Sequence, residues 1–170
     1  MNSVPLIRSG VANIFIAITA LDGMSMPGRK FLVDTGATVT TIPKDFLINI
    51  LGYTEEFIID NKILLPDDEK PLMADGKKAD LYKLKAPRIN ISGYEMQTNF
   101  ILTSDTIKTL NFILGLDVLQ FFNFSFNFDA IDEDAPHGRM FYEFRESRIT
   151  LFTKLGEPFA YKLNDSSVKE

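Results

Sequence analysis

The sequence predicts one all-β domain that closes into a barrel or a sandwich and carries one or two short helices. Three observations support this fold class: the strand-like runs are short, Gly, Pro and Asp turns separate them, and few segments have helical spacing. The chain has 170 residues, which suits one domain, and 45% of them are hydrophobic, which is enough for a core. We expect an N-terminal arm at residues 1–10, the domain at 11–163 and a loose tail at 164–170.

The first strand is predicted in the apolar run from Val11 to Leu21. Its β-branched residues recur at every second position, at Ile14, Ile16 and Ile18, which is the period of a strand with one buried face. We prefer this interpretation to the apolar region of a secretory signal, because no compelling cleavage site follows the run. No stretch of the sequence approaches the roughly 20 apolar residues of a membrane-spanning helix.

The next elements follow from turn residues and a change of period. A Gly/Pro turn at 22–29 leads into a second strand at 30–34, so the first two strands form a hairpin. A third short strand is predicted at 39–42. Helical spacing then runs from Lys44 to Leu51, and Gly52 suits the left-handed cap that ends many helices.

The segment from Ile63 to Leu102 again has the pattern of strands and tight turns. Asp75-Gly76 is a dipeptide favoured in two-residue hairpin loops, where both central residues take positive φ. A further hairpin is predicted around Gly93. The remaining expected elements are a helical turn at 106–110, an apolar run at 112–114, a second helix at 116–122 and strands at 140–144, 149–152 and 159–163.

The clearest alternation in the chain lies between Phe122 and Phe128. Four Phe residues occupy every second position, and Asn or Ser separates them. Side chains at every second position of a strand share one face. The pattern therefore predicts a strand whose Phe face is buried in the core, in preference to an exposed aromatic binding surface.

Composition excludes several classes of function. The absence of Cys removes disulfides, thiol catalysis and Cys-ligated zinc, and it favours a reducing, cytoplasmic location. One histidine, His137, leaves no multi-His metal site within a chain. A net charge of −5, without a basic stripe, argues against a nucleic-acid partner. We expect no membrane partner and no metal or organic cofactor.

A carboxylate at the end of an apolar strand is the most informative local feature. Asp34 follows Phe31, Leu32 and Val33, and burial disfavours a charged carboxylate unless the site uses it. Thr35 offers a hydroxyl, and Gly36 lets backbone or substrate approach closely. The structural alternative is an Asp that only caps a loop.

The motif does not stand alone. Asp34-Thr35-Gly36-Ala37 is followed at a distance by Ile113-Leu114-Gly115 and a helix-like segment, and the hairpin segment from Leu72 to Leu84 lies between them. This order resembles the retropepsin-like aspartic peptidases, the family of retroviral and retrotransposon-type proteases and their cellular or bacterial relatives. The resemblance implies a closed β-barrel with one lobe per chain and a catalytic Asp34, with Thr35, Gly36 and Ala37 supporting its loop. It also implies a flap whose tip is Met73, Ala74, Asp75, Gly76 and Lys77.

One departure from the family pattern is self-consistent. Retroviral members commonly have Asp after the Ala and Arg after the second-motif Gly, and these two side chains pair. Here the two positions are Thr38 and Leu116, so both halves of the ion pair are absent together. The departure concerns viral-type substrate recognition and leaves Asp34 in place.

The resemblance implies an aspartic endopeptidase that works as a homodimer on a peptide or protein substrate. Such enzymes activate a water between two carboxylates, and the chain has one Asp-Thr-Gly, so the second Asp34 must come from a second copy. Thr35 would then lock the two loops together, and Gly36 would offer backbone to the substrate. Two alternatives remain: a non-catalytic module of this fold that dimerises or binds peptide, and an unrelated β-sandwich with a chance motif.

Overall fold

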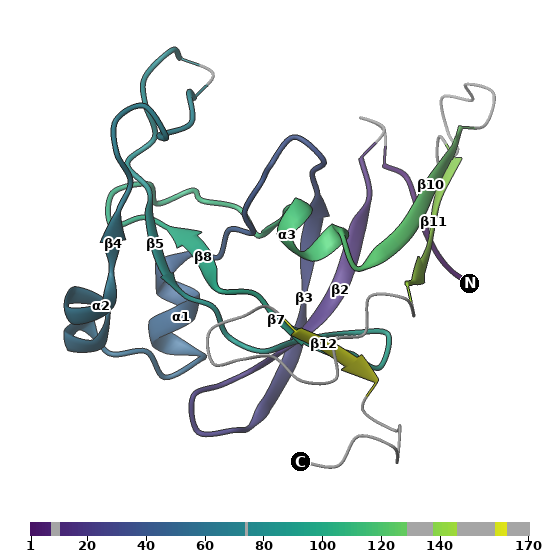
Figure 1. Ribbon diagram of the computed structural model, residues 1–170, viewed down its shortest axis with the longest axis horizontal. Coiled ribbons are helices and arrows are strands. Elements are labelled where there is room, and N and C mark those ends of the chain that lie inside the picture. The colour runs from purple at the N-terminus through teal and green to yellow at the C-terminus, as the bar shows by residue number, and fades with distance from the viewer. Residues whose placement is uncertain (8–10, 74, 129–137, 146–158, 163–170) are drawn as a thin grey trace.

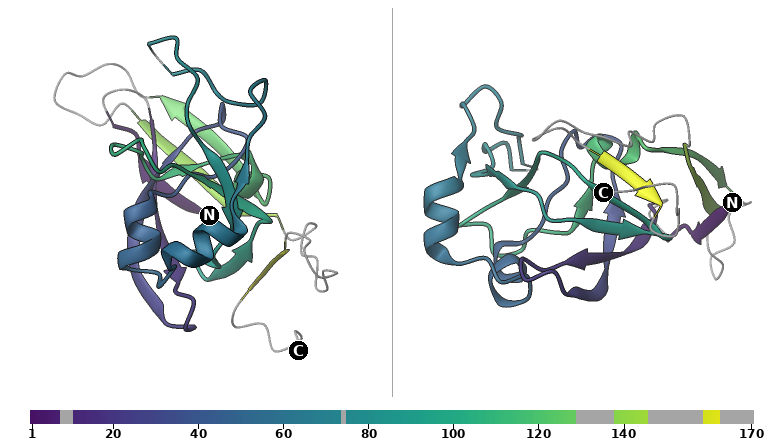
Figure 2. Two further views of the ribbon diagram at one scale, coloured as in Figure 1. Left: turned by 90° about the vertical axis from the view of Figure 1, so that its left-hand side faces the viewer. Right: turned by 60° about the horizontal axis from the view of Figure 1, so that its bottom comes forward.

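The computed structural model describes residues 1–7, 11–73, 75–128, 138–145 and 159–162 of the chain, the last four by their backbone alone. These residues form a mostly β structure of three sheets with three short helices. Helices α1 and α2 lie at one end, and the sheet that contains β10 and β11 lies at the other (Figures 1 and 2). The predicted strand at 149–152 and tail at 164–170 lie outside the described residues.

The central sheet has six strands in the order β12-β7-β6-β2-β3-β9. Its strands are β2 (Asn13–Thr19), β3 (Ser25–Val33), β6 (Ile89–Ile91), β7 (Tyr94–Gln97), β9 (Ile113–Leu114) and β12 (Phe159–Lys162). The β2–β3 hairpin confirms the first predicted pair of strands. β9 runs parallel to the end of β3, with Leu32 beside Ile113 and Val33 beside Leu114. Two segments about 80 residues apart in sequence therefore end side by side.

A second sheet contains β4 (Ile63–Leu64), β5 (Tyr82–Lys85) and β8 (Phe100–Thr103), in the order β4-β5-β8. Thr41 connects it to the central sheet, because Thr41 bridges both Leu102 and Ile113. This bridge replaces the short strand that the sequence predicts at 39–42. The described ladders remain separate sheets with open edges, so the closed barrel that the resemblance implies is not formed by them.

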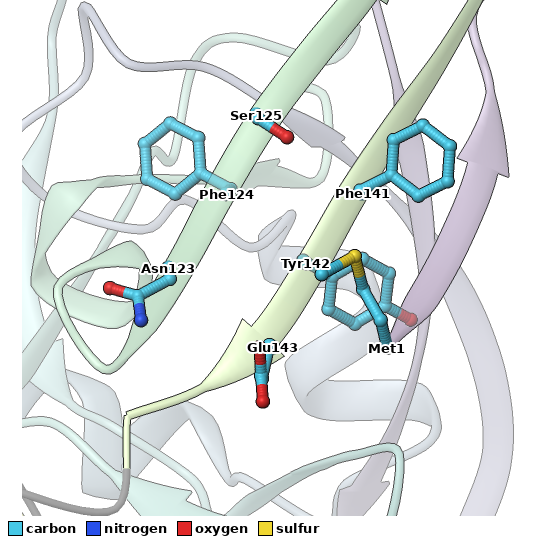
Figure 3. Close-up of a pocket in the computed structure, with 7 residues that line it drawn as sticks. All are labelled: Met1, Asn123, Phe124, Ser125, Phe141, Tyr142 and Glu143. Atoms are coloured by element: carbon cyan, nitrogen blue, oxygen red, sulfur yellow. The ribbon is translucent and has the colours of Figure 1, made fainter.

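The third sheet has the order β1-β11-β10, with β1 at Asn2–Pro5, β11 at Gly138–Phe144 and β10 at Phe122–Phe128. β1 lies within the expected N-terminal arm. Figure 3 shows β10 beside β11, where Met1, Asn123 and Phe141 help to line a shallow hollow of about 120 Å³.

The predicted burial of all four Phe side chains in β10 is wrong for half of the strand. Phe122 is buried and Phe124 is half-buried, whereas Phe126 is 36% and Phe128 65% exposed. The alternation correctly predicts a strand with one aromatic face. Its far end, however, extends beyond the core of the protomer.

The three helices are α1 (Lys44–Asn49), α2 (Glu55–Asn61) and α3 (Leu116–Leu119), one more than the sequence predicts. α1 and α3 confirm the two expected helices, and Gly52 has the expected positive φ of 79°. The additional helix, α2, begins at Thr54, whose hydroxyl accepts a hydrogen bond from Phe57 N at 3.0 Å. Residues 106–110 form turns and not a helix.

The core lies between the sheets and under α1. Its largest fully buried side chains include Ile16, Ile18, Phe31, Ile42 and Leu47. A smaller cluster, made of Leu65, Ala79 and Leu81, supports the segment that leads into β5. Among the helices of the described part of the chain, none is long and apolar enough to cross a membrane.

Candidate active site

The chain leaves the central sheet at Asp34, in the first turn after β3. The preceding Phe31 and Val33 are buried, whereas Asp34 is partly exposed. Asp34 N donates to Leu114 O at 3.1 Å, and Asp34 Oδ1 accepts from Gly36 N at 2.8 Å. Ala37 N closes the turn by donating to Asp34 O at 3.2 Å. The buried strand and these three bonds fix the position of the carboxylate.

The second motif lies directly against this turn. Leu116 N donates to Ala37 O at 2.8 Å, and Asp117 N donates to Thr38 O at 3.1 Å. A side chain at Gly115 would not fit, because a Cβ there would lie 2.8 Å from the carbonyl carbon of Val39. The structure thus brings Asp34 to Ala37 together with Ile113 to Gly115, and only glycine permits so close an approach of two backbones.

Asp117 and Thr40 make a polar link between the two motifs, and neither is predicted from the sequence as a site residue. The Asp117 carboxylate accepts from Thr40 N at 3.1 Å and from Thr40 Oγ1 at 2.8 Å. It also accepts from Val118 N at 2.9 Å. Thr40 Oγ1 in turn accepts from Gly115 N at 3.1 Å. The sequence offered one signal for Asp117, because it is an acidic residue inside the apolar run from Ile113 to Leu119.

The environment of Asp117 has opposing effects on its ionisation. Burial raises the pKa of the carboxyl above its ordinary value, and the hydrogen bonds from Thr40 and Val118 partly oppose that shift. Since these donors occupy the carboxylate oxygens, Asp117 holds the loops together and is not available to share a proton with Asp34. Asp117 and Thr40 thus connect the loop after Asp34 to the start of α3.

The tip of the turn faces outward. Thr35 and Gly36 are exposed, and within the described residues the Thr35 hydroxyl has no hydrogen-bond partner. A Cβ at Gly36 would lie 3.2 Å from Asp34 Oδ1, so a larger residue would crowd the carboxylate. Thr35 and Gly36 are therefore accessible to a further chain or a ligand beside Asp34.

The predicted flap is a hairpin closed by a bridge between Leu72 and Lys78. Met73 N donates to Lys77 O at 2.8 Å, and Gly76 N donates to Met73 O at 2.9 Å. Gly76 has positive φ (79°) and Asp75 does not, so the turn is not the two-residue type predicted from Asp75-Gly76. Ala74 lies outside the described residues.

The two-residue turn with two positive φ values occurs instead at Ser92 and Gly93, which have φ of 51° and 88°. It joins β6 to β7, where Ile91 lies opposite Tyr94. The hairpin that the sequence predicts around Gly93 is therefore confirmed, and its turn is the type expected at Asp75-Gly76.

The base of the flap is fixed by a charged cluster around Asp105. Its carboxylate accepts from Lys44 Nζ at 2.7 Å, from Lys62 Nζ at 3.3 Å and from the Tyr82 hydroxyl at 2.9 Å. The hydrogen bond from Lys44 is the main reason that the pKa of Asp105 falls to about 2. The same contact raises the pKa of Lys44. Tyr82 begins β5, so this cluster connects the flap base to α1 and to the residue after α2.

The flap tip, by contrast, is held by its own bonds. Lys77 N donates to Asp75 Oδ1 at 3.0 Å, while Leu72 and Met73 are 72% and 43% exposed. Within the described residues, no hydrogen bond joins this hairpin to the Asp34 turn. The structure therefore brings the two motifs together and leaves the flap apart from them.

Comparison with known proteins gives a distant likeness to a solved structure. No known family model matches the chain, and neither does any curated protein. A similar solved structure is a retropepsin-like aspartic protease from Rickettsia conorii, at 17% identity over 82% of this chain and 87% of that chain, with a TM-score of 0.46. A likeness at this identity and TM-score concerns the general fold alone.

Proposed function

We propose that the chain is an aspartic endopeptidase that hydrolyses peptide bonds as a homodimer. The observation that carries this proposal is the position of Asp34, which lies in a tight turn held by Gly36 N and braced by Gly115 of the second motif. Such bracing keeps a carboxylate in one place, which catalysis by water activation requires. The substrate would be a peptide or a protein, and the proposed location is the cytoplasm.

The chemistry requires two carboxylates that share one proton. One acts as a general base on water, and the other, protonated, donates a hydrogen bond to the carbonyl of the peptide bond. One chain contributes a single Asp34, and Asp117 is occupied by Thr40 and Val118. The second carboxylate is therefore assigned to Asp34 of another copy, which puts the site on a two-fold axis.

The proposal assigns roles to the surrounding groups. The exposed Thr35 hydroxyl would bond to the partner's turn across the axis. The Gly36 backbone would contact the substrate main chain. Leu72 and Met73, which are exposed on the flap, would cover the bound peptide and exclude water.

The test is a subunit-mixing experiment with the substitution Asp34→Asn. Equal amounts of wild-type and substituted chains, once shown by native mass spectrometry to exchange, form about one quarter wild-type dimers by random pairing. Activity should fall to about a quarter of that of the same total concentration of wild-type protein. A value near one half would mean that each chain works alone and would overturn the two-chain mechanism. Absence of turnover in a well-folded wild-type dimer would instead support a non-catalytic binding module.

A further inference from the structure

The candidate flap enters and leaves the second sheet on neighbouring strands. Its incoming arm begins at β4 and its outgoing arm continues into β5, and the two strands pair antiparallel, with Leu64 opposite Tyr82. Lys62 directly precedes β4, and its ammonium lies 5.2 Å from the centroid of the Tyr82 ring, within the range of a cation–π contact. The two arms therefore touch at their base, which we call the flap stem (residues 62–65 and 79–82).

Asp105 binds both arms of the flap stem at once. Its Oδ1 accepts from the Tyr82 hydroxyl at 2.9 Å, and its Oδ2 accepts from Lys62 Nζ at 3.3 Å. Lys44 of α1 also donates to Oδ1, at 2.7 Å, and lies 2.9 Å from the carboxylate of Glu55 in α2. Figure 1 shows both helices beside β4 and β5 at this end of the molecule. One carboxylate thus connects the two arms to each other and to the helices.

An apolar cluster supports the same stem. Leu65 of the incoming arm is buried together with Ala79 and Leu81 of the outgoing arm. The half-buried side chains of Ile107 and Leu110, from the turns after β8, pack against these three. The turns that follow β8 therefore hold the stem through apolar contacts as well as through the charge of Asp105.

The segment that holds the stem leads directly into the second motif. Phe112 O accepts from Leu32 N at 2.9 Å, two residues before Asp34. The next residues form β9, which pairs with the end of β3, and Gly115 then braces the Asp34 turn. The flap stem and the Asp34 turn are thus attached to the two ends of one short segment, although no hydrogen bond joins the described flap residues to that turn.

We propose that Asp105 is a positioning residue for substrate binding, which holds the flap stem so that the tip can lie over Asp34. The inference deepens the proposed function and rests on it. Asp105 acts through Tyr82 and Lys62 and does not itself touch the peptide. Because the flap would contact the substrate before and during the reaction alike, loss of its position should weaken binding more than it slows the chemical step.

The first test removes the hydroxyl group of one buried tyrosine at a time. Tyr82→Phe deletes the bond to Asp105, and it should raise KM at least about threefold while kcat stays within about twofold. Tyr53→Phe is the matched control, because Tyr53 is 2% and Tyr82 3% exposed, and the Tyr53 hydroxyl donates to Lys85 O at 3.0 Å. Lys85 is at the opposite end of β5 from Tyr82. The control should lose similar stability in urea unfolding and keep the wild-type KM.

The second test is a double-mutant cycle. Asp105→Ala should raise KM more than Tyr82→Phe does, because it also releases Lys62. Adding Tyr82→Phe to Asp105→Ala should then change KM little, since the hydroxyl has already lost its acceptor. Effects on KM that multiply in the double variant would overturn the inference, as would a fall in kcat at constant KM. Should Asp105→Ala fail to fold, Tyr82→Phe and its control decide.

A binding measurement separates this inference from the proposed function. The probe is a peptide with a hydroxyl group in place of the scissile carbonyl, which mimics the tetrahedral intermediate, and calorimetry gives its Kd. If wild type cleaves peptides and Tyr82→Phe leaves both KM and Kd unchanged, the positioning role is overturned and the peptidase stands. If wild type binds the probe without turnover, and Kd rises in Tyr82→Phe but not in Tyr53→Phe, the peptidase is removed and the positioning role in peptide binding stands. A wild-type protein that neither cleaves peptides nor binds the probe would overturn both.

Discussion

Asp117 binds Thr40 across 77 positions of sequence through both the backbone N–H and the hydroxyl of the threonine. The same hydroxyl accepts from Gly115 N at 3.1 Å. One carboxylate and one hydroxyl therefore connect the loop after Asp34 to the start of α3. This connection holds the candidate catalytic turn against the second motif.

The substitution Asp117→Ala should destabilise the fold by roughly 2 kcal/mol, because it leaves the buried donors of Thr40 and Val118 without an acceptor. Asp117→Asn retains one oxygen acceptor and should cost less than about 1 kcal/mol. Urea unfolding of the two variants measures the difference. If both variants lost the same free energy of unfolding, the charge of Asp117, and not its hydrogen bonds, would be what stabilises the fold.

Gly115→Ala should cost about 1–3 kcal/mol, because the atoms that a Cβ would meet belong to backbone and cannot move aside cheaply. It should also lower peptidase activity in the fraction that remains folded, since it pushes the Asp34 turn away. Gly23→Ala is the control: Gly23 has φ of 87° and open space around it, so the cost of about 1 kcal/mol is conformational only. Unchanged activity in Gly115→Ala would contradict the bracing role.

Asp105 should make stability depend on pH in the acid range. Its pKa is about 2 in the fold against an ordinary value of 3.8, so its contribution is present above about pH 4 and is lost as the pH falls toward 2. Since the side chain is 37% exposed, we expect about 1 kcal/mol after allowing for solvent screening.

The measurement is the free energy of unfolding between pH 4 and pH 2, with and without Asp105→Asn. The substituted protein should show a flatter profile over this window. Asp67→Asn is the control: Lys70 also lowers the pKa of Asp67, but the pair lies on the open surface, so its removal should change the profile much less. An identical slope in wild type and Asp105→Asn would refute the assignment.

The flap should gain protection when a peptide-like inhibitor binds. Amide hydrogen exchange of residues 72–78 should be fast in the free protein and slow in the complex, because the hydrogen bonds of the described tip residues lie within the hairpin itself. Residues 82–85 provide an internal control, since β5 is already paired with β8. Protection that rises equally in both segments would indicate general stabilisation and not closure of a flap.

Local patterns in the sequence predicted the segments that carry the candidate site. The period-two run from Ile14 to Ile18 and the apolar run into Asp34 both form strands, and Ile113-Leu114 forms the short strand beside them. These predictions succeeded because burial on one face leaves a period that the sequence itself records. No periodic pattern in the sequence indicates the hydrogen bonds between Asp117 and Thr40, since the two residues come together only in the folded chain.

The predictions for other parts of the chain were wrong for identifiable reasons. α2 was missed although Thr54 followed by two Glu is a helix-start signal, because the helix is only seven residues long and its inward side offers one fully buried residue, Ile58. The burial of Phe126 and Phe128 was mispredicted because the alternation shows that one face is apolar, but not what covers it. Closure of a sheet into a barrel also depends on pairing between strands that are distant in sequence, and turn residues do not specify that pairing.

The β1 edge of the third sheet bears on how large an assembly can grow. Leu6 N donates to Gly138 O at 2.9 Å, so the ladder alternation turns Pro5 toward the outer edge of β1. Proline has no N–H, and it removes a donor that another strand would need on that side. The β1 edge is therefore protected against the edge-to-edge pairing from which open-ended assemblies grow.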